Sequence, residues 1–203
     1  MESEVAFQKL KSFIDQLIRV TDDEWAAHKS LLRHEQVERG GFLLRPGQVC
    51  ERVSFVAGGL VRSYKTIRDQ DCTMFFAFTG DYVTDYSSFL TRTPSDTYLQ
   101  ALEPTDVVHL YYGDMQTGYE QYPVWQKYGR LIAEHIYILL AQRTNQLQTL
   151  SPEELYQTML KETPRILEQV PQHYIASYLG IQPESLSRIR KRMMNKDSKS
   201  YRD

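Results

Sequence analysis

The residues best suited to recognition chemistry lie near the end of the chain, in the stretch "YIASYLGIQPESLSRIRK". Arginine donates to guanine, glutamate accepts from the amino group of cytosine, and lysine and arginine neutralise phosphates. If the segment after Pro183 is a helix, its outward positions are Glu184, Ser185, Ser187, Arg188, Lys191 and Arg192. These six residues are therefore predicted to bind the major groove of double-stranded DNA.

Two short helices joined by a tight turn must position that polar face. The spacing predicts a first helix over residues 172–179, with Ala176 where two helices cross closely. Gly180 is expected to end that helix by adopting a positive φ, a backbone conformation that glycine adopts at low cost. Pro183 suits the first turn of the second helix. The buried positions are expected to be Ile175, Leu179, Leu186 and Ile189. This is the pattern of a helix-turn-helix.

The distribution of charge along the chain also favours a nucleic-acid partner for this end of the protein. Residues 188–203 carry seven basic and two acidic side chains, a net charge of +5, whereas the whole chain carries −2. The remaining 187 residues therefore sum to −7. A basic end on an acidic body favours a polyanionic partner at that end.

The preceding sequence predicts an α+β protein. Residues 4–19 show helical apolar spacing, and Thr21 with Glu24 is typical of a capped second helix. From Gly40 to Leu110, short β-rich runs alternate with turn residues, which indicates an antiparallel sandwich or barrel. No helix of useful length is expected between those runs, and this argues against a parallel sheet.

A long helix is predicted over about residues 124–147, with apolar residues around most of its circumference. The β domain would cover one side, and a second copy of the helix the other. Ser151, Pro152 and Glu154 then signal a new helix. The predicted domains are residues 1–122, the dimerisation helix 123–147, and the DNA-binding domain 148–203.

The sequence gives little support for an enzymatic activity or for a metal site. The β-rich region contains only one histidine, His109, so a histidine-rich metal set of the cupin type cannot be assembled there. Cys50 and Cys72 lack CxxC spacing and are expected to be reduced thiols. No secretory signal or membrane-spanning run is evident. We expect a cytoplasmic protein that is not an enzyme, with no assigned metal or cofactor.

Over residues 20–195, the chain resembles the Crp/Fnr family of bacterial transcription regulators. "GGFLLRPGQVCERVSFVAGGLVRSYK" is similar to the early part of that family's β-roll, and "IASYLGIQPESLSRIRK" to its helix-turn-helix, especially in the branch common in Bacteroidetes-type bacteria. The resemblance implies an N-terminal jelly-roll like cyclic-nucleotide-binding domains, a long dimerisation helix and a C-terminal winged-helix-like domain. It implies base-reading roles for Glu184 and Arg188, a homodimer through residues 123–147, and RNA polymerase as a further partner.

Two departures from the family pattern bear on ligands. Thr84 and Asp85 stand where nucleotide-binding members have glycine and glutamate, and "PSDTY" lacks their phosphate-binding arginine. Burying a phosphate without a cation is costly, so cyclic AMP is not the expected effector. Pro183 replaces the arginine that often precedes the base-reading glutamate, which predicts a different target sequence.

An unidentified small-molecule effector would instead contact Arg62, Tyr64, Asp85, Tyr86, Ser87, Ser88 and Thr97, with Tyr128 as a lid contact. Two function classes remain open on the sequence. One is a dimeric, sequence-specific DNA-binding regulator. The other is a ligand-binding or protein-interaction module with a degenerate pocket.

Overall fold

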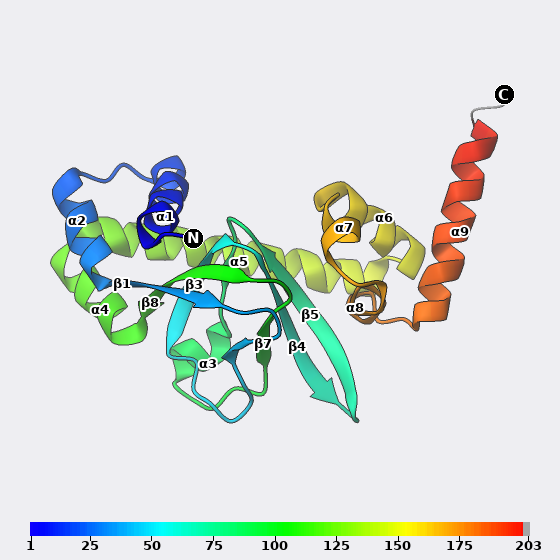
Figure 1. Ribbon diagram of the computed structural model, residues 1–203, viewed down its shortest axis with the longest axis horizontal. Coiled ribbons are helices and arrows are strands. Elements are labelled where there is room, and N and C mark those ends of the chain that lie inside the picture. The colour runs from blue at the N-terminus through cyan, green and yellow to red at the C-terminus, as the bar shows by residue number, and fades with distance from the viewer. Residues whose placement is uncertain (201–203) are drawn as a thin grey trace. The chain divides into compact units, whose positions relative to one another are not determined.

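A computed structural model of the 203-residue chain describes the backbone of residues 1–200 and the side chains of residues 1–194 (Figure 1). The chain forms two compact units. The first comprises residues 1–65 and 75–138, and the second comprises residues 66–74 and those from 139 onward. The tip of one β-hairpin therefore belongs to the second unit.

The first unit begins with the two predicted helices, α1 (Ser3–Leu17) and α2 (Asp22–Leu31). Helix α1 buries Ala6, Leu10 and Ile14, which recur every four residues along one face. Helix α2 starts with the predicted capping box, in which the Thr21 side chain accepts from the Glu24 amide and Glu24 accepts from the Thr21 amide. The prediction that Thr21 and Glu24 cap the start of this helix is confirmed.

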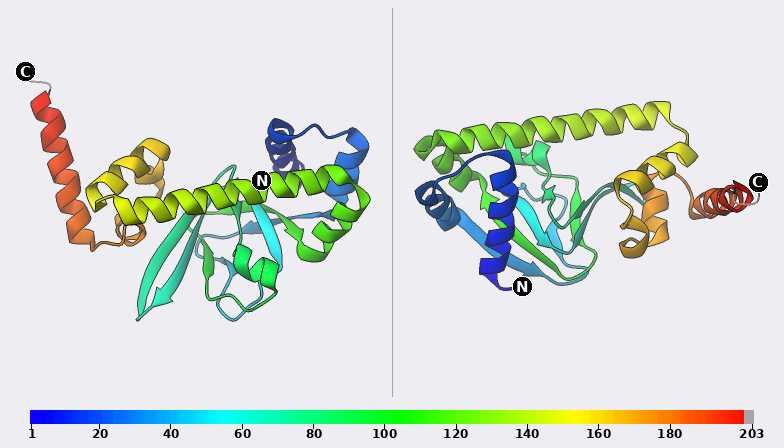
Figure 2. Two further views of the ribbon diagram at one scale, coloured as in Figure 1. Left: turned by 180° about the vertical axis from the view of Figure 1, so that it is seen from behind. Right: turned by 90° about the horizontal axis from the view of Figure 1, so that it is seen from above.

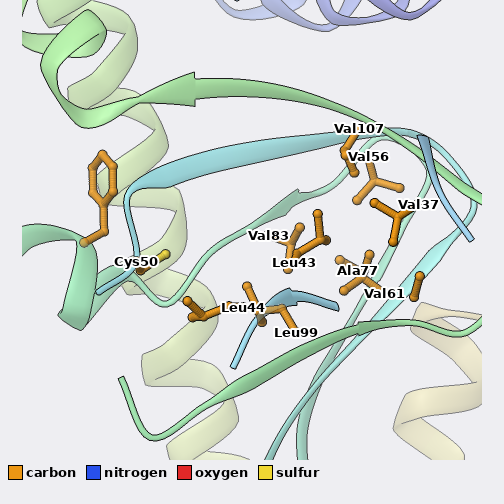
Figure 3. Packing of buried hydrophobic residues seen from close by; sticks show 12 residues of the cluster. Val37, Leu43, Leu44, Cys50, Val56, Val61, Ala77, Val83, Leu99 and Val107 are labelled. Carbon is orange, nitrogen blue, oxygen red and sulfur yellow. The ribbon is translucent and has the colours of Figure 1, made fainter. Parts of the chain in front are cut away.

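Within the described part of the chain, eight strands form two antiparallel four-stranded sheets. Their orders are β1-β8-β3-β6 and β2-β7-β4-β5. The strands are β1 (Leu32–Val37), β2 (Phe42–Leu44), β3 (Arg52–Gly58), β4 (Leu60–Ile67), β5 (Gln70–Phe78), β6 (Tyr82–Val83), β7 (Tyr98–Ala101) and β8 (Thr105–Tyr111). Aliphatic side chains from both sheets, including Val56, Val61, Leu99 and Val107, form the core between them (Figure 3). The predicted antiparallel roll is confirmed.

Three elements of the first unit differ from the sequence prediction. Strand β1 begins at Leu32, before the predicted β-rich region, and pairs with β8 from Leu32↔Leu110 to Val37↔Thr105. A short helix, α3 (Tyr86–Thr91), interrupts the strands, and α4 (Tyr112–Gln121) follows β8. The fully buried residue of α4 is Gly118, and the apolar side chains Tyr112, Met115 and Tyr119 are only partly buried, so the periodic signal of this helix is weak.

The outer face of the first sheet is covered by helices. Phe55, Ala57 and Val108 from that sheet pack in one cluster with α1 and with Trp125 at the start of α5. Trp125 stacks on His28 of α2 at a centroid distance of 3.9 Å. This cluster fixes the first turns of α5 against the β-roll.

Helix α5 (Pro123–Thr149) is one unbroken helix that passes from the first unit into the second (Figure 2). The second unit continues with α6 (Pro152–Glu162), α7 (Ile166–Gln169), α8 (Gln172–Tyr178) and α9 (Pro183–Ser200). Ser151 caps α6 in a second capping box with Glu154, as predicted. Across the described residues, no helix is both long and apolar enough to cross a membrane.

Candidate nucleic-acid interface

The turn between α8 and α9 has the geometry that the sequence predicted. Gly180 has φ +69°, and its amide donates to the Ser177 carbonyl at 3.1 Å. The Ile181 amide donates to the Ala176 carbonyl at 3.0 Å. These two bonds define a Schellman motif with glycine in the left-handed position. The carbonyls at the end of α8 are thus satisfied, and the chain turns sharply into α9.

Helix α9 separates its apolar and polar residues as expected. Leu186 and Ile189 are 1% and 4% exposed, and Ile175, Ala176 and Leu179 of the preceding helix region are also buried. The opposite face is exposed at Glu184, Ser187, Arg188, Lys191 and Arg192, with Ser185 half-buried. All six residues predicted to contact DNA therefore lie on the accessible part of one helix. Lys196, Lys199 and Arg202 of the basic segment lie outside the residues whose side chains are described.

Two of the exposed arginines have partners within their own unit. Arg188 Nη2 donates to Ser185 Oγ at 3.2 Å. Arg192 Nη2 lies 3.0 Å from Oε2 of Glu153 in the first turn of α6. Sequence reasoning did not select Glu153, because nothing in the local sequence shows that the start of α6 lies beside α9.

The second unit also contains the tip of the β4–β5 hairpin. Arg68 and Asp69 at the turn both have positive φ, 51° and 61°, which is the pattern of a two-residue type I′ turn. Ser177 Oγ of α8 accepts from the Thr73 amide at 2.9 Å and donates to the Asp71 carbonyl at 2.7 Å. One hydroxyl therefore joins the hairpin tip to the first helix of the helix-turn-helix.

In the first unit, the predicted effector residues Asp85, Ser88 and Thr97 are linked by hydrogen bonds around α3, directly or through Ser95. Asp85 caps this helix by accepting from the Ser88 amide at 3.2 Å, and its second oxygen accepts from Ser95 Oγ at 2.6 Å. Ser88 Oγ donates to the Thr93 carbonyl. The Thr97 amide donates to Ser95 Oγ. Ser95 lies within the "PSDTY" segment, so that segment places a neutral hydroxyl against the Asp85 carboxylate.

The remaining effector candidates form other contacts. Arg62, 1% exposed, lies over the ring of Tyr64 at 4.1 Å, and Tyr64 stacks on Tyr98 at 4.7 Å. The Tyr128 hydroxyl lies 2.7 Å from that of Tyr82, and burial raises the pKa of both groups, so both are neutral at pH 7. Tyr86 packs against Phe89, and the Ser87 carbonyl accepts from Thr91.

His109 is packed inside the β-roll. It is 1% exposed, with Nδ1 2.8 Å from Ser54 Oγ and Nε2 2.9 Å from Oε2 of Glu35. Burial, together with the nearby positive charge of Arg52, lowers the pKa of His109 to about 4. The imidazole is therefore neutral at pH 7 and links three strands through hydrogen bonds. Among the described residues, no cluster of three or more His, Cys, Asp or Glu side chains is arranged to hold a metal ion.

Comparisons with known proteins identify the fold. No family model and no curated protein matches the sequence. Solved structures do match. FixK2 of Bradyrhizobium japonicum has a TM-score of 0.70 at 17% identity, covering 82% of this chain and 86% of that one.

Two further structures agree. CLP, a c-di-GMP-responsive global regulator of Xanthomonas campestris, has a TM-score of 0.65 at 14% identity and covers 87% of this chain and 93% of that one. A putative Crp/Fnr-family transcriptional regulator of Eubacterium rectale has the same TM-score and identity, covering 87% and 85%. The chain therefore has the fold of transcription regulators that join a cyclic-nucleotide-binding-like roll to a helical DNA-binding domain. More particularly, it has the Crp/Fnr fold.

Proposed function

We propose that this protein is a dimeric, sequence-specific DNA-binding transcription regulator, without enzymatic activity, whose β-roll responds to an effector other than cyclic AMP. The observation that carries the proposal is the exposed polar face of α9. Its arginines and lysine project from a helix that begins directly after the Gly180 turn, with Leu186 and Ile189 buried behind it. This is how a recognition helix presents side chains to a major groove.

The second half of α5 supports a homodimer. Tyr137, Leu140 and Leu147 are 73%, 62% and 53% exposed. With Ala133 and Thr144, they are spaced four, three, four and three residues apart along the helix. That spacing is the heptad repeat of a coiled-coil seam, which a second copy of the same helix covers with matching side chains. A two-fold dimer would place two α9 helices about 34 Å apart, one turn of DNA.

The α3 region supports an effector without a cyclic phosphate. A buried phosphate needs a cation or several free donors. Here Ser95 donates to Asp85, and Ser88 donates to a backbone carbonyl. Asp85 itself is an acceptor and would repel an anion. Titrating cyclic AMP in a calorimeter tests this part of the proposal, and we expect no binding heat at micromolar concentrations.

The decisive experiment is a binding titration of fluorescent duplex DNA by anisotropy at several salt concentrations. A regulator should bind a random duplex with an affinity that falls steeply as salt rises, through counterion release from phosphates. It should also select a near-palindromic sequence from a randomised library. The protein-interaction alternative predicts neither result.

Matched variants assign the binding to α9. Replacing Arg188, Lys191 and Arg192 by alanine should abolish binding at salt concentrations where the unaltered protein binds. A control variant replaces three exposed basic residues of the first unit, Arg19, Arg39 and Lys127, and so loses the same charge. If both variants lose affinity equally, the effect is one of net charge and α9 is not the interface.

A further inference from the structure

A carboxylate faces the basic side of α9. Glu153 is the second residue of α6, following Pro152, and the positive end of the helix dipole stabilises an acid there. Its Oε2 lies 3.0 Å from Nη2 of Arg192. The Glu153 side chain is 23% exposed and that of Arg192 is 62% exposed, so the pair is accessible from solvent.

The pair lines a hollow between the start of α6 and α9. The hollow has a volume of about 440 Å³ and is bounded by Ser151, Pro152, Glu153, Ile181, Ser185, Arg188, Ile189 and Arg192. Two of these residues, Arg188 and Arg192, belong to the proposed DNA face. Glu153 provides the acidic group in this lining. The hollow thus brings both arginines together with one negative charge.

We propose that Glu153 competes with a DNA phosphate for Arg192 and thereby lowers the affinity of the protein for all DNA sequences. This inference rests on the proposed function. A guanidinium pairs with carboxylate and phosphate through the same kind of donor, so the Nη2 group that pairs with Glu153 is withheld from a phosphate. The carboxylate also repels any phosphate that approaches the hollow. Glu153 affects the phosphate contacts, and base reading by Glu184 and Arg188 is left unchanged.

The test replaces Glu153 by glutamine, which keeps the side-chain shape and removes the charge. Glu153→Gln should raise affinity about two- to fivefold for both a selected and a random duplex, because a solvent-accessible ion pair no longer has to be broken. The ratio of the two affinities should stay the same. The slope of log affinity against log salt should steepen by about 0.9, the value for one more phosphate contact.

Glu168→Gln is the matched control. Glu168 is an exposed residue of α7 in the same unit, and its replacement changes the net charge by the same amount. We expect less than a twofold effect on affinity. Thermal melting followed by circular dichroism confirms that both variants are folded.

A double variant separates competition from general repulsion. In an Arg192→Ala background, Glu153→Gln should lose most of its effect, because the contested cation is gone. If the full gain persists there, repulsion alone explains it and the competition is refuted. An affinity of Glu153→Gln equal to that of Glu168→Gln, or below that of the unaltered protein, also overturns the inference. The proposed function fails separately, if the unaltered protein shows no salt-dependent binding to DNA.

Discussion

Replacing Gly180 by alanine tests the turn on which the proposed interface depends. A Cβ built on Gly180 meets no atom within 4 Å, so the replacement creates no clash. The cost is conformational, because φ +69° lies in the left-handed region. An L-residue is disfavoured there by about 1–2 kcal/mol, and alanine also restricts the unfolded chain, which offsets part of that cost. We expect a net loss of about 1 kcal/mol of stability in the second unit.

Gly59→Ala provides the contrasting case. There a Cβ would lie 2.5 Å from Thr105 Oγ1, 2.7 Å from Thr105 Cα and 2.8 Å from the Pro104 carbonyl oxygen, at φ +103°. Backbone atoms cannot move away as a flexible side chain does. Strain and overpacking together should cost the first unit about 3 kcal/mol or more. At Gly180 only the backbone angle disfavours a side chain, whereas at Gly59 both the backbone angle and the lack of space disfavour it.

The assay must report on each unit by itself, since a single transition is not assured for two units. Both tryptophans, Trp25 and Trp125, lie in the first unit, so their fluorescence during urea unfolding reports on Gly59→Ala. Amide exchange of peptides covering residues 172–182 reports on Gly180→Ala, through the Ile181 amide that donates to Ala176. Gly180→Asn should cost less than alanine, because asparagine tolerates the left-handed region better. Equal losses for asparagine and alanine, or no loss in either, would refute this account of the turn.

Three further predictions concern the interface, the dimer and the hairpin. Arg188→Ala should lose about 1–3 kcal/mol of discrimination at one base pair of a selected site, whereas Lys191→Ala should weaken binding evenly and reduce the salt slope by about 1; equal loss on selected and random duplexes would exclude Arg188 from base reading. Leu140→Asp should shift the protein to a monomer in analytical ultracentrifugation, because a charge would be placed in the apolar seam; an unchanged mass would contradict the seam. Ser177→Ala should destabilise the docked hairpin tip by about 1 kcal/mol and speed exchange of the Thr73 amide, while Ser177→Thr, which keeps the hydroxyl, should not; equal exchange in both variants would refute the role of the hydroxyl.

Much of the helix-turn-helix and of the helix before it was predictable because the signals for these elements are local. Ser151 with Glu154 marks a helix start, Gly180 marks a helix end, and Leu186 with Ile189 marks one face of the following helix. Each of these signals depends on residues within one or two helical turns of each other, so it can be recognised directly in the sequence. The antiparallel roll was also predictable, since short β-rich runs separated by turn residues favour it.

Other elements could not be predicted from local pattern. The sequence of β1 alone does not show that Leu32 pairs with Leu110, because pairing depends on a strand far along the chain. The mostly polar sequence of α4 gives only a weak periodic signal, from Tyr112, Met115 and Tyr119. The effector region was predicted as a set of ligand contacts, yet only the folded chain shows that Asp85 accepts from Ser95.

By itself, the sequence determined the helix-turn-helix, the polar composition of its second helix and the long helix over about residues 124–147, because these depend on neighbours within a few residues. Only the tertiary structure decided which groups those side chains meet. It places Glu153 against Arg192 and Ser177 against the hairpin tip. The physical reason is that hydrogen bonds and ion pairs depend on distances in space, and the packing of buried faces brings together residues that are far apart in the chain.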